Sequence, residues 1–270
     1  MSLYIKNGRL VDPKSGLDRV CDILCVDGKI EGISQETGEF ETLDKSAGEL
    51  TTKRERMYKI LEDPSTEMID AAGMIVAPGL VDVHSHFRDP GQTQKEDILT
   101  GAEAAAAGGY TSIIMMANTV PTVDNEETLS YVLEKGRNTK INIYACANVT
   151  AGMQGEHITD MKTLHRAGAV GFTDDGKPIV DEALLRSAMK TCAELNVPIS
   201  LHEEDPAYVG VAGVNEGEVS RKMGVRGADR QAEITMVERD LKIAMETGAA
   251  VDIQHISAAE SVELVRQARE

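Results

Sequence analysis

The segment Gly79-Leu80-Val81-Asp82-Val83-His84-Ser85-His86 decides how the rest of this sequence is interpreted. An apolar, β-branched run of this length is typical of a buried strand, here with two histidines at its end. Side chains at positions i and i+2 point to the same face of a strand, so the imidazoles of His84 and His86 project together. Two neutral imidazoles can bind one divalent metal ion, although two incidental polar histidines would give the same short pattern.

Strands and helices alternate from Met68 to the end of the chain. We expect strands at 79–84, 111–116, 141–147, 169–173, 197–202 and 250–255, and helices at 95–107, 126–137, 157–167, 181–195, 230–247 and 258–268. Such repetition favours a parallel sheet with helices outside it. The predicted fold class is α/β: a TIM-like (β/α) barrel over residues 76–270 with about six of eight units, incomplete at the C-terminus.

The first 75 residues predict a small β-sandwich-like domain. Asn7-Gly8 and Asp27-Gly28 are hairpin signals within it. Residues 36–67 are rich in charge and poor in large apolar side chains, which indicates a solvated insertion. This insertion could be a mobile loop or a short surface helix around 53–61, and a docking element for a partner is the alternative.

Composition narrows the classes of function. With 28 basic and 45 acidic residues, the formal net charge of −17 disfavours binding to nucleic acid or to an anionic membrane. The chain contains no apolar run long enough to span a bilayer, and its start does not resemble a secretory signal. The four cysteines fit no zinc-finger spacing, so we expect reduced cysteines in a cytoplasmic protein. A small anionic substrate is compatible with this charge, because a local arginine or metal ion can outweigh the global field.

Two further histidines end predicted strands. His202 ends the strand at 198–202, and His255 ends the strand at 251–255. In a barrel of this type the C-terminal ends of the strands are where sites assemble, so these residues and the first pair favour a metal site. His157 and His165 lie in a predicted helical stretch, and we interpret them as structural or solvent-facing.

Other polar residues follow the same strand ends. Asp174-Asp175-Gly176 could supply a carboxylate that bridges two metal ions, or it could simply be a turn. Arg88, next to the histidine pair, could bind a substrate carboxylate in a bidentate manner, and Asn118 could hydrogen-bond the same group. A surface arginine and a polar strand cap are the alternatives.

These segments together resemble the amidohydrolase superfamily, and within it the bacterial dihydroorotases with a bridging aspartate. The resemblance lies in Val76 to Gly91, which opens the barrel, and in four later blocks in the same order: Met116-Ala117-Asn118-Thr119, Phe172-Thr173-Asp174-Asp175-Gly176, His202-Glu203-Glu204-Asp205 and His255-Ile256-Ser257. It covers nearly the whole chain except 36–67. Each block alone is only suggestive, whereas the ordered combination is specific.

The resemblance implies a role for each residue. His84 and His86 would bind one zinc ion, His202 and His255 a second, and Asp175 rather than Asp174 would bridge them. The resemblance also implies that Arg88, Asn118 and the backbone near His86 would hold the carboxylate of dihydroorotate.

The implied reaction is the reversible hydrolysis of dihydroorotate to N-carbamoyl-aspartate in pyrimidine biosynthesis. Zinc can lower the pKa of a bound water to about 7, which makes hydroxide available at neutral pH. The family's general base is an aspartate expected beyond Glu270, so no catalytic acid–base residue is identified and the chain as given is expected to be inactive.

Two alternatives stay open. Hydantoinases and allantoinases, which generally use a carbamylated lysine as the bridge, are the nearest enzymes, but the segment 171–176 contains no lysine. The chain could instead be a catalytically silent homologue that acts as a structural partner, for instance of aspartate carbamoyltransferase. A homodimer is an expectation from the family.

Overall fold

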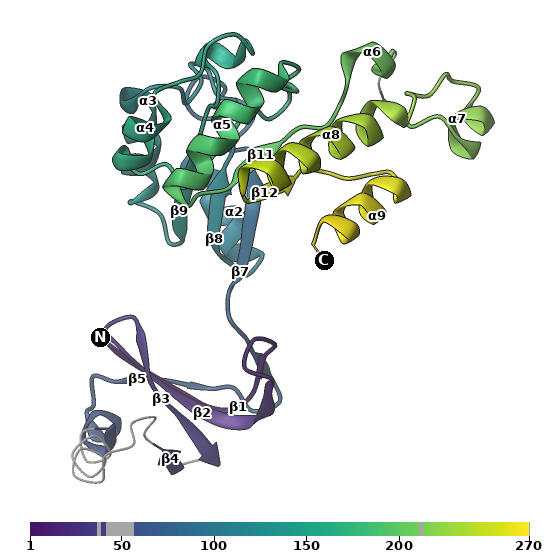
Figure 1. Ribbon diagram of the computed structural model, residues 1–270. Helices are drawn as coiled ribbons and strands as arrows, with labels where there is room; N and C mark the ends of the chain where they lie inside the picture. Colours follow the sequence, from purple (N-terminus) through teal and green to yellow (C-terminus); the bar gives the residue numbers. More distant parts are fainter. Residues whose placement is uncertain (37–38, 42–56, 211–212, 270) are drawn as a thin grey trace. The chain divides into compact units, whose positions relative to one another are not determined.

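The computed structural model describes residues 1–36, 39–41, 57–210 and 213–269. The chain divides into two compact units, Met1–Gly79 and Leu80–Glu270 (Figure 1). Each unit is built around a sheet of six strands.

The first unit is a mixed sheet with the strand order β4-β3-β2-β1-β5, in which β6 also pairs with β1. The strands are β1 (Ser2–Asp12), β2 (Leu17–Val26), β3 (Lys29–Glu36), β4 (Glu39–Glu41), β5 (Glu67–Asp70) and β6 (Ile75–Val76). Strands β1 to β4 pair antiparallel in chain order, whereas β5 and β6 run parallel to β1. Leu10, Cys21 and Ile23 form a small apolar core on this sheet.

One of the two predicted hairpin turns is confirmed and the other is wrong. Asp27 and Gly28 join β2 to β3 with φ angles of 49° and 76°, as a two-residue turn of this kind requires. Asn7-Gly8 lies inside β1, where the pairing with β2 shifts register between Ile5 and Gly8. Asn7 has a φ of 62°, so the left-handed backbone that suggested a turn instead forms a bulge.

The charged insertion at 36–67 is described only in part, since residues 42–56 lie outside the described ranges. Its residues 57–62 are helical, within the region where a short helix was considered. The expectation of a solvated surface is wrong for Met57, which is 1% exposed and packs with Leu24 of β2. Burying a methionine side chain stabilises a fold by about 1.5–3 kcal/mol, so this end of the insertion is anchored to the sheet.

The second unit is a parallel sheet whose strands follow one another in chain order from β7 to β12. They are β7 (Leu80–Ser85), β8 (Tyr110–Met115), β9 (Asn142–Ala147), β10 (Gly171–Thr173), β11 (Ile199–Leu201) and β12 (Val251–Ile253). The long helices that follow them are α2 (Ile98–Ala107), α3 (Glu126–Gly136), α4 (Met161–Ala167), α5 (Glu182–Leu195), α8 (Gln231–Thr247) and α9 (Ala259–Ala268). All six predicted strand–helix units are therefore present, which is the arrangement of the predicted TIM-like barrel.

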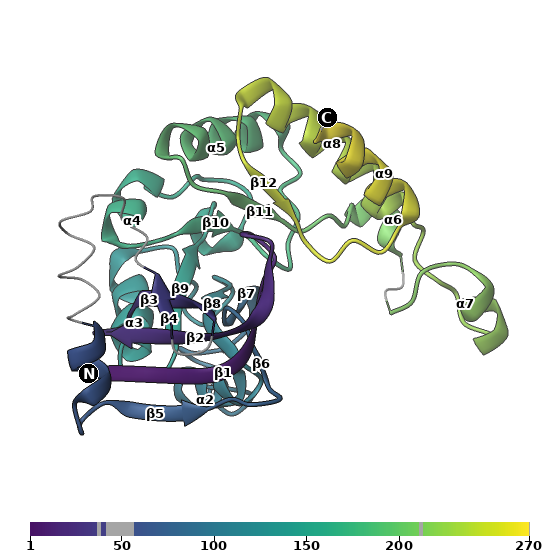
Figure 2. The same ribbon diagram turned by 90° about the horizontal axis from the view of Figure 1, so that it is seen from below.

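Helices α4, α5 and α8 lie on the outer side of strands β10 to β12 (Figure 2). Between the sheet and these helices lies the main core, which includes Phe172, Leu185 and Met189. Local signals set the helix ends. The Asp181 side chain accepts hydrogen bonds from Ala183 N and Leu184 N at the start of α5, and Asn196 ends that helix in a left-handed conformation with φ 54°.

Two details of this unit differ from expectation. Helix α4 begins at Met161 because the Asp160 side chain caps it, so His157 lies in the preceding loop and not in a helix. The segment between β11 and α8 contains two short helices that were not predicted, α6 (Pro206–Val209) and α7 (Glu218–Met223).

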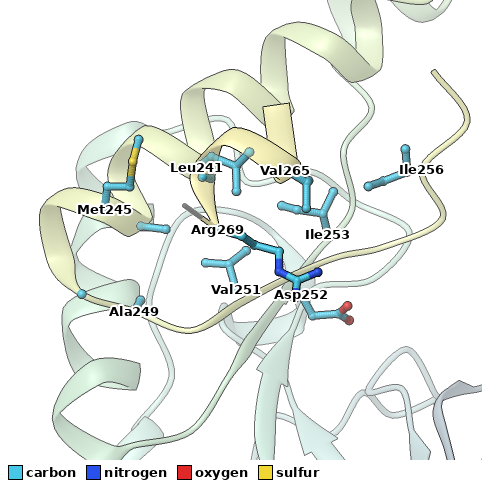
Figure 3. Close-up of a pocket in the computed structure, with 12 residues that line it drawn as sticks. Leu241, Met245, Ala249, Val251, Asp252, Ile253, Ile256, Val265 and Arg269 are labelled. Atoms are coloured by element: carbon cyan, nitrogen blue, oxygen red, sulfur yellow. The ribbon is translucent and has the colours of Figure 1, made fainter. Parts of the chain in front are cut away.

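Apolar surface is accessible at both ends of the parallel sheet. On β7, Val81 and Val83 are 60% and 52% exposed. At the other end a hollow of about 500 Å³ lies between α8, β12 and α9, with Leu241, Val251 and Val265 among its lining residues (Figure 3). No helix in the described ranges has both the length and the apolar character that crossing a bilayer demands.

Candidate metal centre

The five predicted ligands come from four strands and meet at one edge of the parallel sheet. His84 is in β7 and His86 follows it, Asp175 comes shortly after β10, His202 follows β11, and His255 comes shortly after β12. Parallel strands present their C-terminal ends at the same edge, so residues far apart in sequence converge there. The structure brings all five together in two groups that share Asp175: His84, His86 and Asp175, and Asp175, His202 and His255.

Asp175 occupies the centre of this cluster. Its Oδ1 atom lies 3.4 Å from His255 Nε2, 3.7 Å from His84 Nε2 and 3.8 Å from His202 Nδ1. Its Oδ2 atom lies 3.3 Å from His86 Nε2. The side chain is almost fully buried, so a carboxylate is placed between four imidazoles with little water to solvate it. A buried carboxylate in such a place needs protons or cations to balance its charge.

The spacing of the ring nitrogens fits a metal ion in each group. His84 Nε2 lies 3.1 Å from His86 Nε2, and His202 Nδ1 lies 3.3 Å from His255 Nε2. Facing lone pairs repel, so each pair needs a shared proton or a cation. Ligands bound to a tetrahedral zinc ion at about 2.0–2.1 Å lie about 3.3 Å from one another. Imidazole and carboxylate are donors that suit zinc, so the residues present fit the predicted ion.

Neighbouring side chains orient two of the histidines. His86 Nδ1 lies 3.0 Å from Asn118 Oδ1, so a proton on Nδ1 leaves Nε2 free to face Asp175. His202 Nε2 lies 3.3 Å from Glu204 Oε2, which likewise leaves Nδ1 free to face the cluster. Sequence reasoning gave Glu204 no role. A carboxylate two residues after a strand-end histidine is the signal that could have found it.

Asn118 lies beside the cluster but is engaged by its ligands. Its Nδ2 donates to Asp175 Oδ2 at 2.9 Å and to the Asp175 backbone oxygen at 3.2 Å, while Oδ1 faces His86. The side chain thus connects the strand-end loops after β8 and β10. Its predicted contact with a substrate carboxylate stays a prediction, and the structure adds an orienting role for two predicted ligands.

The structure distinguishes the two adjacent aspartates physically. Asp174 is also buried, but its carboxylate accepts hydrogen bonds from Val149 N at 2.9 Å, from Thr150 N at 3.2 Å and from the Thr150 hydroxyl. Those donors belong to the segment after β9. Burial raises the pKa of Asp174, and its hydrogen bonds oppose that shift. Asp174 therefore holds the loop after β9, whereas Asp175 faces the cluster.

Arg88 is partly buried and lies close to the first group. Burial is the largest cause that lowers the pKa of His86; the nearby Asp175 opposes it and the Arg88 charge adds to it. A neutral imidazole is the form that binds a metal ion. Arg88 has a φ of 42° and His255 a φ of 38°, conformations that cost a non-glycine residue about 1–3 kcal/mol. Such strain tends to persist where surrounding structure holds a functional residue in place.

The two remaining histidines lie elsewhere. His165 is in α4, where Nδ1 faces the Ala169 backbone oxygen at 3.2 Å, and His157 is in the loop before that helix. Within the part of the chain that the structure describes, the two candidate metal groups include neither residue.

Comparison with known proteins decides the family. Residues 73–261 match the family model described as dihydro-orotase-like, which covers all five clustered residues. The chain belongs to the dihydro-orotase-like family. Among curated relatives, the dihydroorotases of Clostridioides difficile (strain 630) and Streptococcus pneumoniae serotype 4 are each 48% identical to it over 267 residues. Those matches take in 99% of the chain but only 58% of each relative's length.

Solved structures of hydantoinases share the fold. An L-hydantoinase from Arthrobacter aurescens superimposes with a TM-score of 0.71 at 24% identity, covering 99% of this chain and 55% of that protein. A D-hydantoinase superimposes with the same TM-score at 22% identity. At such identities the similarity concerns the fold alone.

Proposed function

We propose that this chain forms the larger part of the active site of a zinc-dependent dihydroorotase. The reaction is the reversible hydrolysis of dihydroorotate to N-carbamoyl-aspartate. The observation that carries the proposal is the position of Asp175, a buried carboxylate 3.3–3.8 Å from the ring nitrogens of four histidines. The names of these two relatives, of whose length the chain spans 58%, support dihydroorotate as the substrate.

In this proposal His84 and His86 would hold one zinc ion, His202 and His255 would hold a second, and Asp175 would be the ligand that the two groups share. When bound, such ions act as Lewis acids and make water a better nucleophile at neutral pH. Arg88 binds the substrate carboxylate, for which the planar guanidinium is well suited. Asn118 and Glu204 fix the orientation of the two imidazoles that they contact. Proton transfer to the leaving nitrogen requires a general acid–base, and we assign that role to none of the described residues.

The aspartate also bears on the choice between cyclic amidases. A hydantoinase-type centre would need a carbamylated lysine where Asp175 lies. The nearest lysine in sequence, Lys177, donates from Nζ to the Met153 backbone oxygen at 3.1 Å and so is committed elsewhere. This favours the dihydroorotase over the hydantoinase proposal. Association as a homodimer or with aspartate carbamoyltransferase, and a cytoplasmic location, stay predictions.

The proposal is tested by assaying the full-length, zinc-loaded protein with dihydroorotate and with hydantoin. We expect turnover of dihydroorotate and a kcat/KM for hydantoin lower by more than about 100-fold, because hydantoin lacks the carboxylate that Arg88 binds. Arg88→Ala should raise the KM for dihydroorotate more than it lowers kcat. A preference for hydantoin, or an unchanged KM in Arg88→Ala, would contradict the assignment.

A further inference from the structure

Arg88 and Asp89 are adjacent in the segment that joins β7 to α2, but their surroundings are opposite. Arg88 is partly exposed and lies near His86, whereas Asp89 is 0% exposed. A fully buried carboxylate is uncommon unless other groups satisfy it. The hydrogen-bond partners of Asp89 therefore show which elements hold the segment between β7 and α2 in place.

Three donors satisfy the Asp89 carboxylate. The Tyr131 hydroxyl donates to Oδ1 at 2.9 Å, Lys135 Nζ donates to Oδ2 at 2.6 Å, and the Ile98 backbone N–H donates to Oδ2 at 3.2 Å. Tyr131 and Lys135 are four residues apart on α3, so they lie on one face of that helix. Ile98 is the first residue of α2. Asp89 thus ties the segment after β7 to two helices at once.

The backbone of the segment between β7 and α2 also makes its own hydrogen bonds and close contacts. The Val120 N–H donates to the Pro90 backbone oxygen at 3.1 Å, and the Gln92 N–H donates to the Arg88 backbone oxygen at 2.9 Å. Gly91 has a φ of 88°, and a Cβ atom there would lie 1.8 Å from the Val120 backbone oxygen. Only glycine allows this approach. The segment with Arg88 is consequently fixed against the loop that carries Asn118.

A stabilising role alone does not explain the ion pair between Asp89 and Lys135. Only the Asp89 carboxylate is fully buried, and the Lys135 side chain is 27% exposed. The pair gains little over well-packed apolar side chains, because removing the carboxylate from water costs free energy that the attraction to the ammonium largely offsets. Where such pairs are retained, fixing one conformation is a better account. Hydrogen bonding to Asp89 is the largest cause that raises the pKa of Lys135, so the ammonium stays charged over the physiological range. The backbone next to this pair is Arg88 in its left-handed conformation.

We propose that Asp89, Tyr131 and Lys135 are positioning residues for Arg88, and that they set the affinity of the site for substrates that carry a carboxylate. The proposal rests on the proposed function, in which Arg88 binds that carboxylate. None of the three residues would touch the substrate. They act by holding the backbone from which the guanidinium projects, so a change in them displaces Arg88 without removing it.

The test uses orotate, an unreactive ring that carries the same carboxylate as dihydroorotate, with the full-length zinc-loaded protein. Calorimetry gives its dissociation constant for the wild type, Lys135→Met, Tyr131→Phe, Arg88→Ala and the double variant Arg88→Ala/Lys135→Met. Lys140→Met and Tyr110→Phe are the matched controls. Lys140 makes an exposed ion pair with Glu103, and Tyr110 packs against the main core. Zinc content and the thermal unfolding temperature are measured for each variant.

We expect Lys135→Met to weaken orotate binding about tenfold, below the roughly 100-fold loss that a 1 Å displacement of a positioning group can cause. Tyr131→Phe should weaken it about threefold, since the backbone and Lys135 contacts remain. For dihydroorotate, KM should rise by similar factors with kcat within about twofold, with zinc content unchanged. The controls should bind orotate like the wild type. In the Arg88→Ala background, Lys135→Met should have no further effect.

Different outcomes separate the two proposals. A wild type that binds no orotate and hydrolyses no dihydroorotate would overturn the proposed function, and this inference with it. If the wild type binds orotate but Lys135→Met binds it equally well, the inference alone fails. It also fails if Lys135→Met weakens binding by the same factor with and without Arg88, because the effect then does not act through Arg88.

Discussion

The two metal groups share Asp175 but have different surroundings. In the first group, His86 faces Asn118 at 3.0 Å, and the His84 backbone N–H donates to the Asp82 carboxylate at 3.0 Å. In the second group, His202 faces Glu204 at 3.3 Å, but Glu204 is itself 45% exposed. His255 is 48% exposed, against 24% for His84, 28% for His86 and 16% for His202. The neighbours of the first group are partly buried, whereas the second group contains the most exposed of the four histidines.

This difference predicts unequal metal binding. Ligands that are already oriented lose less conformational freedom when an ion binds, so the first group should bind zinc more tightly. His202 and His255 of the second group also line one hollow with Asn215 and Ala228, which lie on either side of the short helix α7 in sequence. The zinc affinity of the second group should therefore depend more than that of the first on the residues around the C-terminal ends of β11 and β12.

The largest expected effect comes from the residue that the two groups share. Asp175→Ala removes the carboxylate from both groups, so it should reduce the zinc bound by each group. Dihydroorotate turnover should fall by well over 100-fold, because loss of an orienting neighbour alone costs roughly 10–100-fold. Zinc content after dialysis and kcat measure this. Asp175→Asn is the control for shape, and it should also fail because its amide nitrogen cannot bind a metal ion. Retention of both ions by Asp175→Ala would break the shared-ligand account.

A pair of histidine variants sharpens the comparison between the groups. His84→Ala should remove the tighter zinc phase, whereas His255→Ala should remove the weaker phase and leave the tighter one nearly intact. Metal competition with a coloured chelator resolves the two affinities. Equal losses of both phases in both variants would mean that the groups bind as one unit and that the comparison is wrong.

Substitution of the orienting neighbours should have a smaller effect. Asn118→Ala removes the side chain that faces His86 Nδ1 and donates to Asp175, so the zinc affinity of the first group should fall by about 10–100-fold. Glu204→Gln should weaken the second group by less than about tenfold, since an exposed partner contributes little. The same chelator assay measures both. A larger effect for Glu204→Gln than for Asn118→Ala would contradict the order.

The smallest expected effect on metal binding belongs to Asp174. Asp174→Asn keeps the size of the side chain but replaces an acceptor oxygen with an amide, so Val149 N or Thr150 N loses a partner. We expect the free energy of unfolding to fall by about 1–3 kcal/mol. Zinc affinity should change by less than about twofold, within the spread expected of a residue that contacts no ligand atom. Chemical denaturation and the chelator assay together check this contrast with Asp175.

The sequence was most informative where strand periodicity and strand ends coincide. His84, His86, His202 and His255 were predicted to converge because parallel strands have a common C-terminal edge, and the structure brings them together around Asp175. The choice of Asp175 over Asp174 needed the resemblance. The physical difference between the two aspartates lies in the hydrogen bonds that Thr150 donates to Asp174, and Thr150 lies 24 residues before Asp174 in the chain.

Other features depend on contacts that periodicity cannot reveal. Asn7-Gly8 fits a turn and a bulge equally well, since both use a left-handed residue, and pairing with β2 decided between them. The burial of Asp89 depends on Tyr131 and Lys135, which follow it by 42 and 46 residues. The charged composition of 36–67 concealed the burial of Met57, because one apolar anchor hardly changes an average over 32 residues.

Titration of zinc into the metal-free protein, followed by calorimetry, tests the central claim most directly. The account predicts two ions per chain in two phases, with the tighter phase lost in His84→Ala and both phases weakened in Asp175→Ala. A single ion or fewer per chain at saturation, or two unchanged phases in Asp175→Ala, would contradict a two-ion centre with Asp175 between the ions.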